Sequence, residues 1–259
     1  MIDCHAHINS EEFDKDRDAV LRDAGSAGIS AILDSGTNLK ENKKVLELAK
    51  QFKILKPSLG WQPNQLDKKA ASENLEFIKE TTNQFVAIGE IGLDYWFRGS
   101  GNQGHRGSEL PTANRKPQTE IFKMYIELAK ELDLPIVTHS RSAGKYVIEI
   151  LEQEKAERVC MHAFDGNFSS AQKGVELGYY FSIPPSIVRS EQKQSLVKNL
   201  PLENLLLESD SPVLGPNAKE RNAPANLKIS AQKIAEIKKV DIDEVIKATT
   251  RNAKELFGL

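Results

Sequence analysis

The sequence has few cysteines and no strong excess of charge of either sign. Only Cys4 and Cys160 occur among its 259 residues, so a disulfide framework is excluded and a reducing compartment, the cytoplasm, is expected. With 35 basic and 37 acidic residues, the formal charge of −2 provides no overall positive field for wrapping duplex DNA. Long hydrophobic runs are also missing. Because none approaches the ~20 residues that span a bilayer, no membrane association is expected.

What is present is a regular alternation of two patterns. Short apolar or β-branched runs alternate with amphipathic helical stretches, and the expected strands cover residues 1–7, 30–35, 54–61, 85–92, 135–140, 158–164, 179–184 and 204–210. This alternation predicts a parallel sheet with right-handed crossovers. Eight such units in this length favour an α/β fold, a closed (β/α)8 TIM barrel in a single domain, over an open doubly wound sheet.

Residues 97–116 interrupt the alternation. This segment has no periodicity and is far longer than the ~2–6 residues usual between a strand and a helix, so we expect an inserted loop after the fourth strand. It holds four basic residues against a single acidic one: Arg98, Arg106, Arg115 and Lys116 against Glu109. Its positive charge suits attraction of nucleic acid and equally suits a solvated loop.

Six imidazole and carboxylate side chains fall at or near the expected C-terminal ends of strands: His5, His7, Glu90, His139, His162 and Asp210. In a parallel barrel these ends open onto one face, so the six side chains are expected to meet there. Such ligands suit Zn²⁺, Mn²⁺, Fe²⁺ or Co²⁺, with Mg²⁺ less natural. They exceed the three protein ligands of a lone catalytic zinc, so we expect two divalent metal ions ~3.5–4 Å apart, bridged by a carboxylate.

At these residues the sequence resembles the TatD-type metal-dependent DNases of the amidohydrolase superfamily. The blocks that carry the resemblance run in order along the chain: DCHAH (3–7), GEIGLDY (89–95), LPIVTHSR (134–141), HAFDG (162–166), LLESDSP (206–212), RNAP (221–224) and NAKELF (252–257). The resemblance implies one metal on His5, His7, Glu90 and Asp210, and a second metal on Glu90, His139 and His162.

The resemblance also implies the activity. It implies a DNase, an exonuclease that removes nucleotides from single-stranded DNA ends in the 3′-to-5′ direction, and a monomer is expected. Glu90 and Asp210 are the expected catalytic residues, with Asp210 orienting the attacking water and accepting its proton. Asp3 and Glu208 each stand two residues before a ligand. They suit hydrogen bonds that orient imidazole or water, and equally suit ordinary bonds that shape the barrel rim.

Substrate contacts are expected from Trp61, Gln62, Arg141 and Arg221. Gln62 stands where the family usually has the histidine of a Gly-x-His-Pro motif, and it can donate a hydrogen bond to phosphate but cannot carry charge. His105 of the insert can supply an imidazole in its place. The two arginines suit a phosphate clamp or a surface ion pair, and Trp61 suits base stacking or plain packing.

Two other functions stay open. The same metals and water can cleave an amide, a lactone or an aminoacyl ester, because fold and site geometry do not fix the electrophile. A third interpretation is a metal-dependent barrel whose main task is to bind nucleic acid or a repair partner, with residual turnover. The intact ligand set disfavours it.

Overall fold

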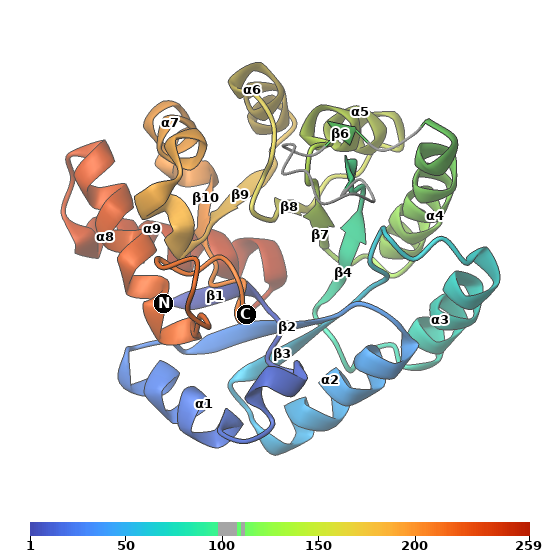
Figure 1. The fold of residues 1–259 in the computed structure, drawn as a ribbon, viewed down its shortest axis with the longest axis horizontal. Helices are drawn as coiled ribbons and strands as arrows, with labels where there is room; N and C mark the ends of the chain where they lie inside the picture. The colour runs from blue at the N-terminus through green and yellow to red at the C-terminus, as the bar shows by residue number, and fades with distance from the viewer. Residues whose placement is uncertain (98–107, 110–111) are drawn as a thin grey trace.

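The computed structural model describes residues 1–97, 108–109 and 112–259, and these form the predicted barrel (Figure 1). Eight parallel strands make one sheet in the order β1-β2-β3-β4-β7-β8-β9-β10. Their bounds are β1 Ile2–Ala6, β2 Ala31–Gly36, β3 Leu55–Leu59, β4 Ala87–Gly92, β7 Ile136–His139, β8 Val159–Met161, β9 Tyr180–Ile183 and β10 Leu205–Leu207. Every expected strand is therefore present, in the expected order.

Helices form a ring outside the strands (Figure 1). They are α1 Arg17–Ser26, α2 Leu39–Gln51, α3 Lys68–Glu80, α4 Thr112–Glu131, α5 Gly144–Gln153, α6 Phe168–Glu176, α7 Glu191–Asn199, α8 Leu227–Lys238 and α9 Ile242–Phe257. Short 3-10 turns are η1 Glu11–Phe13, η2 Pro185–Arg189, η3 Leu202–Asn204 and η4 Pro224–Asn226. Several helices begin at side chains that accept a hydrogen bond from a backbone N–H of the first turn, namely Asn38, Asp67, Asn167 and Ser190.

The barrel closes where β10 meets β1. The backbone N–H of Asp210 donates to the carbonyl of His5 at 2.9 Å, and that of His7 donates to Ser211 at 2.7 Å. The Oδ1 atom of Asp3 accepts from the backbone N–H of Ser209 at 2.8 Å. These bonds lie just beyond the strands themselves, and they place the two ends of the chain's ligand set, His5 and Asp210, side by side.

Two clusters of buried apolar side chains stabilise the barrel. The larger core lies between the sheet and the surrounding helices. The smaller cluster fills the barrel interior with inward-facing strand residues and is capped by Ala253, Leu256 and Phe257 of α9. Both cysteines belong to this interior cluster as free, fully buried thiols, which agrees with the prediction that no disulfide forms.

The strands end earlier than the sequence pattern predicts. His162 follows β8 by one residue and Asp210 follows β10 by three, although both were expected inside strands. At these ends the backbone turns sharply, with φ of 36° at Ala163 and 50° at Asp210. His162 and Asp210 therefore lie on short loops at the mouth of the barrel, whereas His5, Glu90 and His139 lie within strands.

The segment after β4 is not irregular throughout, although the sequence pattern predicts that it is. A short antiparallel hairpin of β5 (Trp96–Phe97) and β6 (Ser108–Glu109) lies there. Helix α4 begins at Thr112, so the prediction of irregular chain through residue 116 is wrong for the last five residues. The helix contains Pro117, which has no backbone N–H to donate. Arg98, His105 and Arg106 lie outside the described residues.

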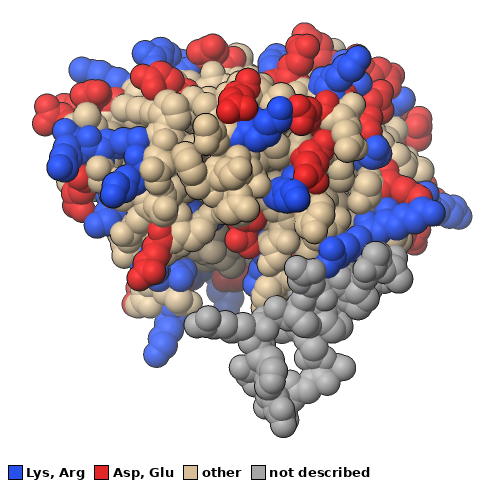
Figure 2. Space-filling view, turned by 90° about the horizontal axis from the view of Figure 1, so that it is seen from above, with Lys and Arg blue, Asp and Glu red and all other residues tan. Residues whose placement is uncertain are grey.

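The surface carries charge of both signs. Figure 2 shows Lys and Arg interspersed with Asp and Glu over the face in view, so no field of a single sign covers that face. None of the helices in the described ranges is long and apolar enough to cross a membrane.

Candidate metal centre and active site

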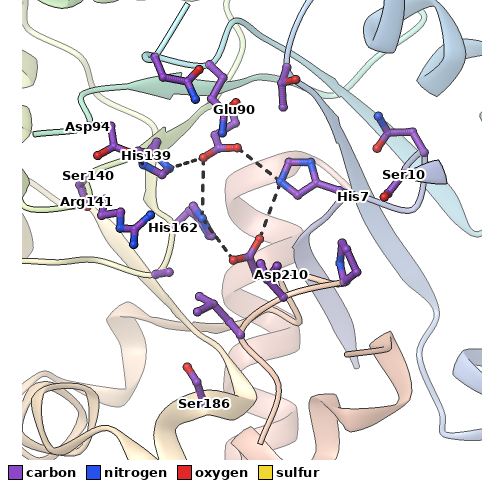
Figure 3. Close-up of a pocket in the computed structure, with 18 of the residues that line it drawn as sticks. His7, Ser10, Glu90, Asp94, His139, Ser140, Arg141, His162, Ser186 and Asp210 are labelled. Carbon is purple, nitrogen blue, oxygen red and sulfur yellow. Dashed lines mark hydrogen bonds and ion pairs between the residues drawn. The ribbon is translucent and has the colours of Figure 1, made fainter. Parts of the chain in front are cut away.

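The six predicted metal ligands converge at the mouth of the barrel, around a cavity of about 1130 Å³ (Figure 3). Five of them line this cavity: His7, Glu90, His139, His162 and Asp210. His5 lies beside them with none of its surface exposed. Side chains from five strand ends, separated by up to two hundred residues in sequence, thus share one site.

His5, His7 and Asp210 form the first group of possible ligands, with ligand atoms within 4.8 Å of one another. The Nε2 atoms of the two histidines face each other at 3.2 Å. Nδ1 of His7 lies 2.8 Å from the carbonyl oxygen of Ser35, which can only accept, so this nitrogen carries the hydrogen. Asp210 Oδ1 lies 3.5 Å from His5 Nε2 and 3.8 Å from His7 Nε2.

Glu90 faces both halves of the site (Figure 3). Its Oε2 atom lies 3.4 Å from Nε2 of His7 and 3.9 Å from Nε2 of His5. Its Oε1 atom makes a short contact with Nδ1 of His139 and lies 4.0 Å from Nε2 of His162. One carboxylate therefore stands between two sets of imidazoles, which is the arrangement a bridging ligand requires.

Local backbone features of β4 direct Glu90 into the mouth. The pairing register of β4 with β7 shifts between Ile88 and Ile91, and such an irregularity re-aims the side chains beside it. A Cβ atom at Gly89 would lie 2.7 Å from Cβ of Val137, so the close approach of the two strands requires glycine. A small residue before Glu90 is therefore part of how the site is built.

Glu208 holds His162 in place. Its carboxylate accepts from Nδ1 of His162 at 2.8 Å and from the backbone N–H of Ala163 at 3.0 Å, and it accepts a short bond from the hydroxyl of Ser182. The hydrogen of the imidazole is therefore on Nδ1. The other ring nitrogen, Nε2, faces Glu90 and Asp210, each 4.0 Å away. Of the two interpretations open for Glu208, the geometry favours the one in which it orients an imidazole.

Asp94 holds His139 in the same way, and sequence reasoning did not single it out. Its Oδ2 atom lies 3.1 Å from Nε2 of His139, on the opposite side of the ring from Glu90. Its Oδ1 accepts from the backbone N–H of Trp96 at 2.9 Å, and its own N–H donates to Gln118 at 2.9 Å. The available signal was its position four residues after Glu90, just past the end of β4.

The pKa values of the site residues reflect their burial and the close packing of ionisable groups. Burial, reinforced by His162 and His7, lowers the pKa of His5 well below its ordinary value. Burial opposes charging of His7 as well, but the Glu90 and Asp210 carboxylates outweigh it and raise the pKa of His7 to about 9. For Glu90, burial is outweighed by the neighbouring histidines, which hold its pKa well below the usual range. Burial raises the pKa of Asp210 to about 6.

Two of the four predicted substrate contacts line the cavity. Gln62 does so from the loop after β3, and Arg141 does so with its guanidinium 3.8 Å from the ring centre of Trp96. The prediction for Trp61 is not supported, because the side chain is 5% exposed and its Nε1 donates to the carbonyl of Gln65 at 2.7 Å. Trp61 is a packing residue of the core.

For Arg221, the structure favours the surface ion pair over the phosphate clamp. Its guanidinium forms a fork on the carboxylate of Asp16, with distances of 2.9 and 2.5 Å, and donates to the carbonyl of Glu12 at 2.6 Å. It also stacks 4.7 Å from the ring centre of Phe13. These contacts hold the guanidinium against the chain around α1. Arg221 is not among the residues that line the cavity.

Asp3 contacts backbone rather than imidazole. Its Oδ1 atom accepts from the N–H of Ser209, as described above, and lies 3.3 Å from the N–H of His5. Burial raises its pKa to about 8. Of the two interpretations open for Asp3, the geometry favours the one in which it shapes the rim by joining β1 to the chain after β10.

Comparisons with known proteins agree with the geometry. The model of the TatD-related DNase family matches residues 2–258. The chain is 41% identical to a Homo sapiens protein named Deoxyribonuclease TATDN3, covering 99% of this chain and 94% of that protein. It is 30% identical to a Shigella flexneri protein named 3′-5′ ssDNA/RNA exonuclease TatD, covering 100% and 99%. The crystal structure of YJJV, a TatD homologue from Escherichia coli, superposes with a TM-score of 0.87 at 27% identity, covering 100% and 98%.

Proposed function

This chain belongs to the TatD-related DNase family, and from that membership we propose that it is a metal-dependent hydrolase that cleaves phosphodiester bonds in DNA. The observation that carries the proposal is the position of Glu90, which directs one carboxylate oxygen at His7 and the other at His139. Such a side chain between two sets of nitrogen ligands fits a pair of divalent ions. The full ligand set proposed is His5, His7, Glu90, His139, His162 and Asp210.

The chemistry of these side chains supports a bound cation. Nε2 of His5 and Nε2 of His7 lie 3.2 Å apart, although Nδ1 of His7 already carries the hydrogen. The carboxylates of Glu90 and Asp210 face these same two nitrogen atoms. Two carboxylates held this close together in a buried site are costly unless positive charge lies between them. The raised pKa of His7 has the same cause, because a proton there offsets the carboxylates that a metal ion would otherwise offset.

Asp210, Glu208 and Asp94 have separate roles beside the proposed metal ions. Divalent ions held by these residues would lower the pKa of bound water and would balance negative charge on phosphate oxygens. Asp210 lines the cavity with its carboxylate between His5 and His162, where it would accept the proton of the attacking water. Glu208 and Asp94 fix which nitrogen of His162 and of His139 carries hydrogen, and so keep the other nitrogen free to bind.

The finer activity we propose is removal of nucleotides from the 3′ end of single-stranded DNA. The name of the Shigella flexneri relative supports this polarity. A cavity closed at its base by the barrel interior also suits a single strand end better than an uninterrupted duplex. The metals proposed are two among Zn²⁺, Mn²⁺, Mg²⁺, Co²⁺ and Fe²⁺.

The test uses single-stranded oligonucleotides labelled at the 5′ or the 3′ end, with and without a chelator. A 3′-to-5′ exonuclease releases labelled mononucleotide at once from the 3′-labelled strand and converts the 5′-labelled strand to a ladder. Chelator should stop both reactions, and Glu90→Gln serves as the inactive control. If no chelator-sensitive cleavage occurs with any of the five metals while an ester or amide substrate turns over, the nuclease proposal is wrong.

A further inference from the structure

One wall of the cavity is built from η2 and the first turn of α7, and we call it the η2 wall. Its cavity-lining members are Ser186, Arg189, Ser190 and Lys193. The N–H of Ser186 donates to the carbonyl of Leu214 at 2.8 Å. Arg189 donates from Nε to the carbonyl of Gly215 at 3.2 Å. The η2 wall therefore packs against the chain that leads away from Asp210, and it lines the same cavity as the proposed cleavage centre.

Lys193 is the only buried lysine or arginine in the described part of the chain, with 8% of its surface exposed. Its Nζ atom donates to the carbonyls of Ala163 at 2.8 Å and Phe164 at 2.6 Å, the two residues after His162. An ammonium group has three N–H donors, so one remains for the cavity that Lys193 lines. Burying a positive charge is costly, and two carbonyls offset only part of that cost.

Carboxylates near Lys193 act on it from a distance. Burial lowers its pKa, while Asp165, Glu208 and Asp210 oppose this shift. Glu208 is occupied by His162, Ala163 and Ser182, and Oδ2 of Asp165 accepts from the backbone N–H of Ser142 at 2.7 Å. No carboxylate of the described residues lies within ion-pair distance of Lys193.

Arg189 has unused donors. Only its Nε atom has a hydrogen-bond partner among the described residues, and the two terminal nitrogens of the guanidinium form no bond or ion pair there. Lys44, on another part of the same cavity, pairs instead with Asp14 at 3.0 Å. A guanidinium with free terminal nitrogens is suited to the paired oxygens of a phosphate group.

The cavity is large enough for more than the group being cleaved. Its volume of about 1130 Å³ exceeds the ~300–1,000 Å³ of typical sites for one small molecule. The metal-ligand cluster occupies one part of it, and the η2 wall lies alongside. A strand whose terminal phosphodiester lies at the cluster therefore has room to place its next phosphate within the same cavity.

We propose that Arg189 and Lys193, assisted by the hydroxyl of Ser186, form a subsite for the phosphate next to the one that is cleaved. The subsite rests on the proposed function, because it assumes a nucleic-acid strand as substrate. It selects substrates that carry a second phosphate and contributes to binding of the strand rather than to chemistry at the scissile bond.

The test compares a substrate that has a neighbouring phosphate with one that has none. The first is a single-stranded oligonucleotide and the second is bis(p-nitrophenyl) phosphate, and kcat and KM are measured for both. Arg189→Gln should raise KM for the oligonucleotide and lower its kcat/KM about tenfold relative to that for the small diester. Arg189→Lys should recover part of the loss. Lys198→Gln removes the same charge from the exposed side of α7, outside the cavity, and serves as the matched control.

Salt dependence and a second variant sharpen the test. Losing one phosphate contact on a single strand should reduce the slope of log affinity against log salt by about 0.7. Lys193→Gln should show the same selective loss. Because Lys193 is buried, its variant is judged by the ratio of the two substrates, which a smaller fraction of folded enzyme does not change.

The outcomes distinguish the subsite proposal from the proposed function on which it rests. A selective loss for the oligonucleotide supports the subsite. An equal loss for both substrates, or unchanged oligonucleotide kinetics in Arg189→Gln, overturns the subsite and leaves the hydrolase proposal standing. If the wild-type protein cleaves neither substrate with any divalent metal, the proposed function itself fails.

Discussion

Oδ2 of Asp94 lies 3.1 Å from Nε2 of His139, while Nδ1 of the same ring contacts Glu90. Carboxylates flank both ring nitrogens and together raise the pKa of His139 to about 10 against the opposing effect of burial. With a metal ion bound on the Glu90 side, Asp94 would hold the hydrogen of the neutral imidazole on Nε2 and leave the lone pair of Nδ1 for the ion. Glu208 does the same for His162 with the two nitrogens exchanged. Both histidines of the second proposed metal position are thus oriented by carboxylates that would not themselves bind the ion.

Replacing Asp94 should weaken metal binding before it affects the fold. We expect Asp94→Ala to bind divalent metal ~10–100-fold more weakly, because the His139 ring loses its orientation and basicity. Asp94→Asn keeps an acceptor oxygen and should recover part of the affinity. The measurement is metal titration followed by calorimetry, with Asp243→Asn on the exposed surface of α9 as control. Wild-type metal affinity in Asp94→Ala would mean that the contact orients nothing.

The barrel and the meeting of the six side chains at its mouth were predictable because their signals are local or repetitive. Each strand is a short apolar run between helical patterns, and parallel strands must all end at one face. His5 and His7 stand two apart at the end of such a run, so their convergence followed from the pleat alone. The exact strand ends did not follow, because the backbone turns at Ala163 and Asp210 depend on bonds to Glu208 and to the carbonyl of His5.

The substrate contacts were harder to predict because their residue types suit two environments. Arg221 can grip phosphate or pair with a carboxylate, and only the fold shows that Asp16, far away in sequence, lies against it. Trp61 can stack a base or fill a core, and its burial decides for the core. Asp94 and Lys193 carry no motif of their own. Their importance comes from what the fold places beside them, which a single sequence does not encode locally.

Asp210→Asn should separate metal binding from turnover. The amide keeps an oxygen that can bind an ion but cannot accept the proton of the attacking water, so we expect kcat to fall ~10²–10⁴-fold. Metal content, measured by elemental analysis after dialysis, should fall much less than activity does. An active Asp210→Asn enzyme would remove the proton-accepting role assigned to Asp210.

Divalent cations should stabilise the folded protein. Two carboxylates and two imidazoles share a buried space in the metal-free state. An ion that binds only the folded form adds ~2.7 kcal/mol of unfolding free energy at one hundred times its Kd. The melting temperature of chelator-treated protein should therefore rise with the logarithm of metal concentration. In Glu90→Gln, which loses the proposed bridge, the rise should be much smaller. A melting temperature that does not respond to any of the candidate metals would contradict the site.

A buried carboxyl outside the ligand set should make stability depend on pH. Asp34 on β2 is fully buried, its Oδ1 accepts from the N–H of Asn9 at 3.1 Å, and burial raises its pKa to about 7. A carboxyl whose folded pKa exceeds the unfolded value of 3.8 stabilises the fold at low pH. That contribution is lost as pH rises towards 7, by at most ~1.4 kcal/mol per pH unit, because ionisation is easier in the unfolded chain.

Asp34→Asn stays neutral at every pH and should remove this dependence. We expect the unfolding free energy of the variant, relative to wild type, to increase between pH 5 and pH 7 and then level off. Urea unfolding of metal-free protein at pH 5, 6, 7 and 8 measures the difference. Ile32→Val, a neutral change at a fully buried position of the same strand, should cost ~0.5–1.5 kcal/mol equally at each pH. A constant difference between Asp34→Asn and wild type over this range would show that Asp34 is ionised in the folded protein throughout.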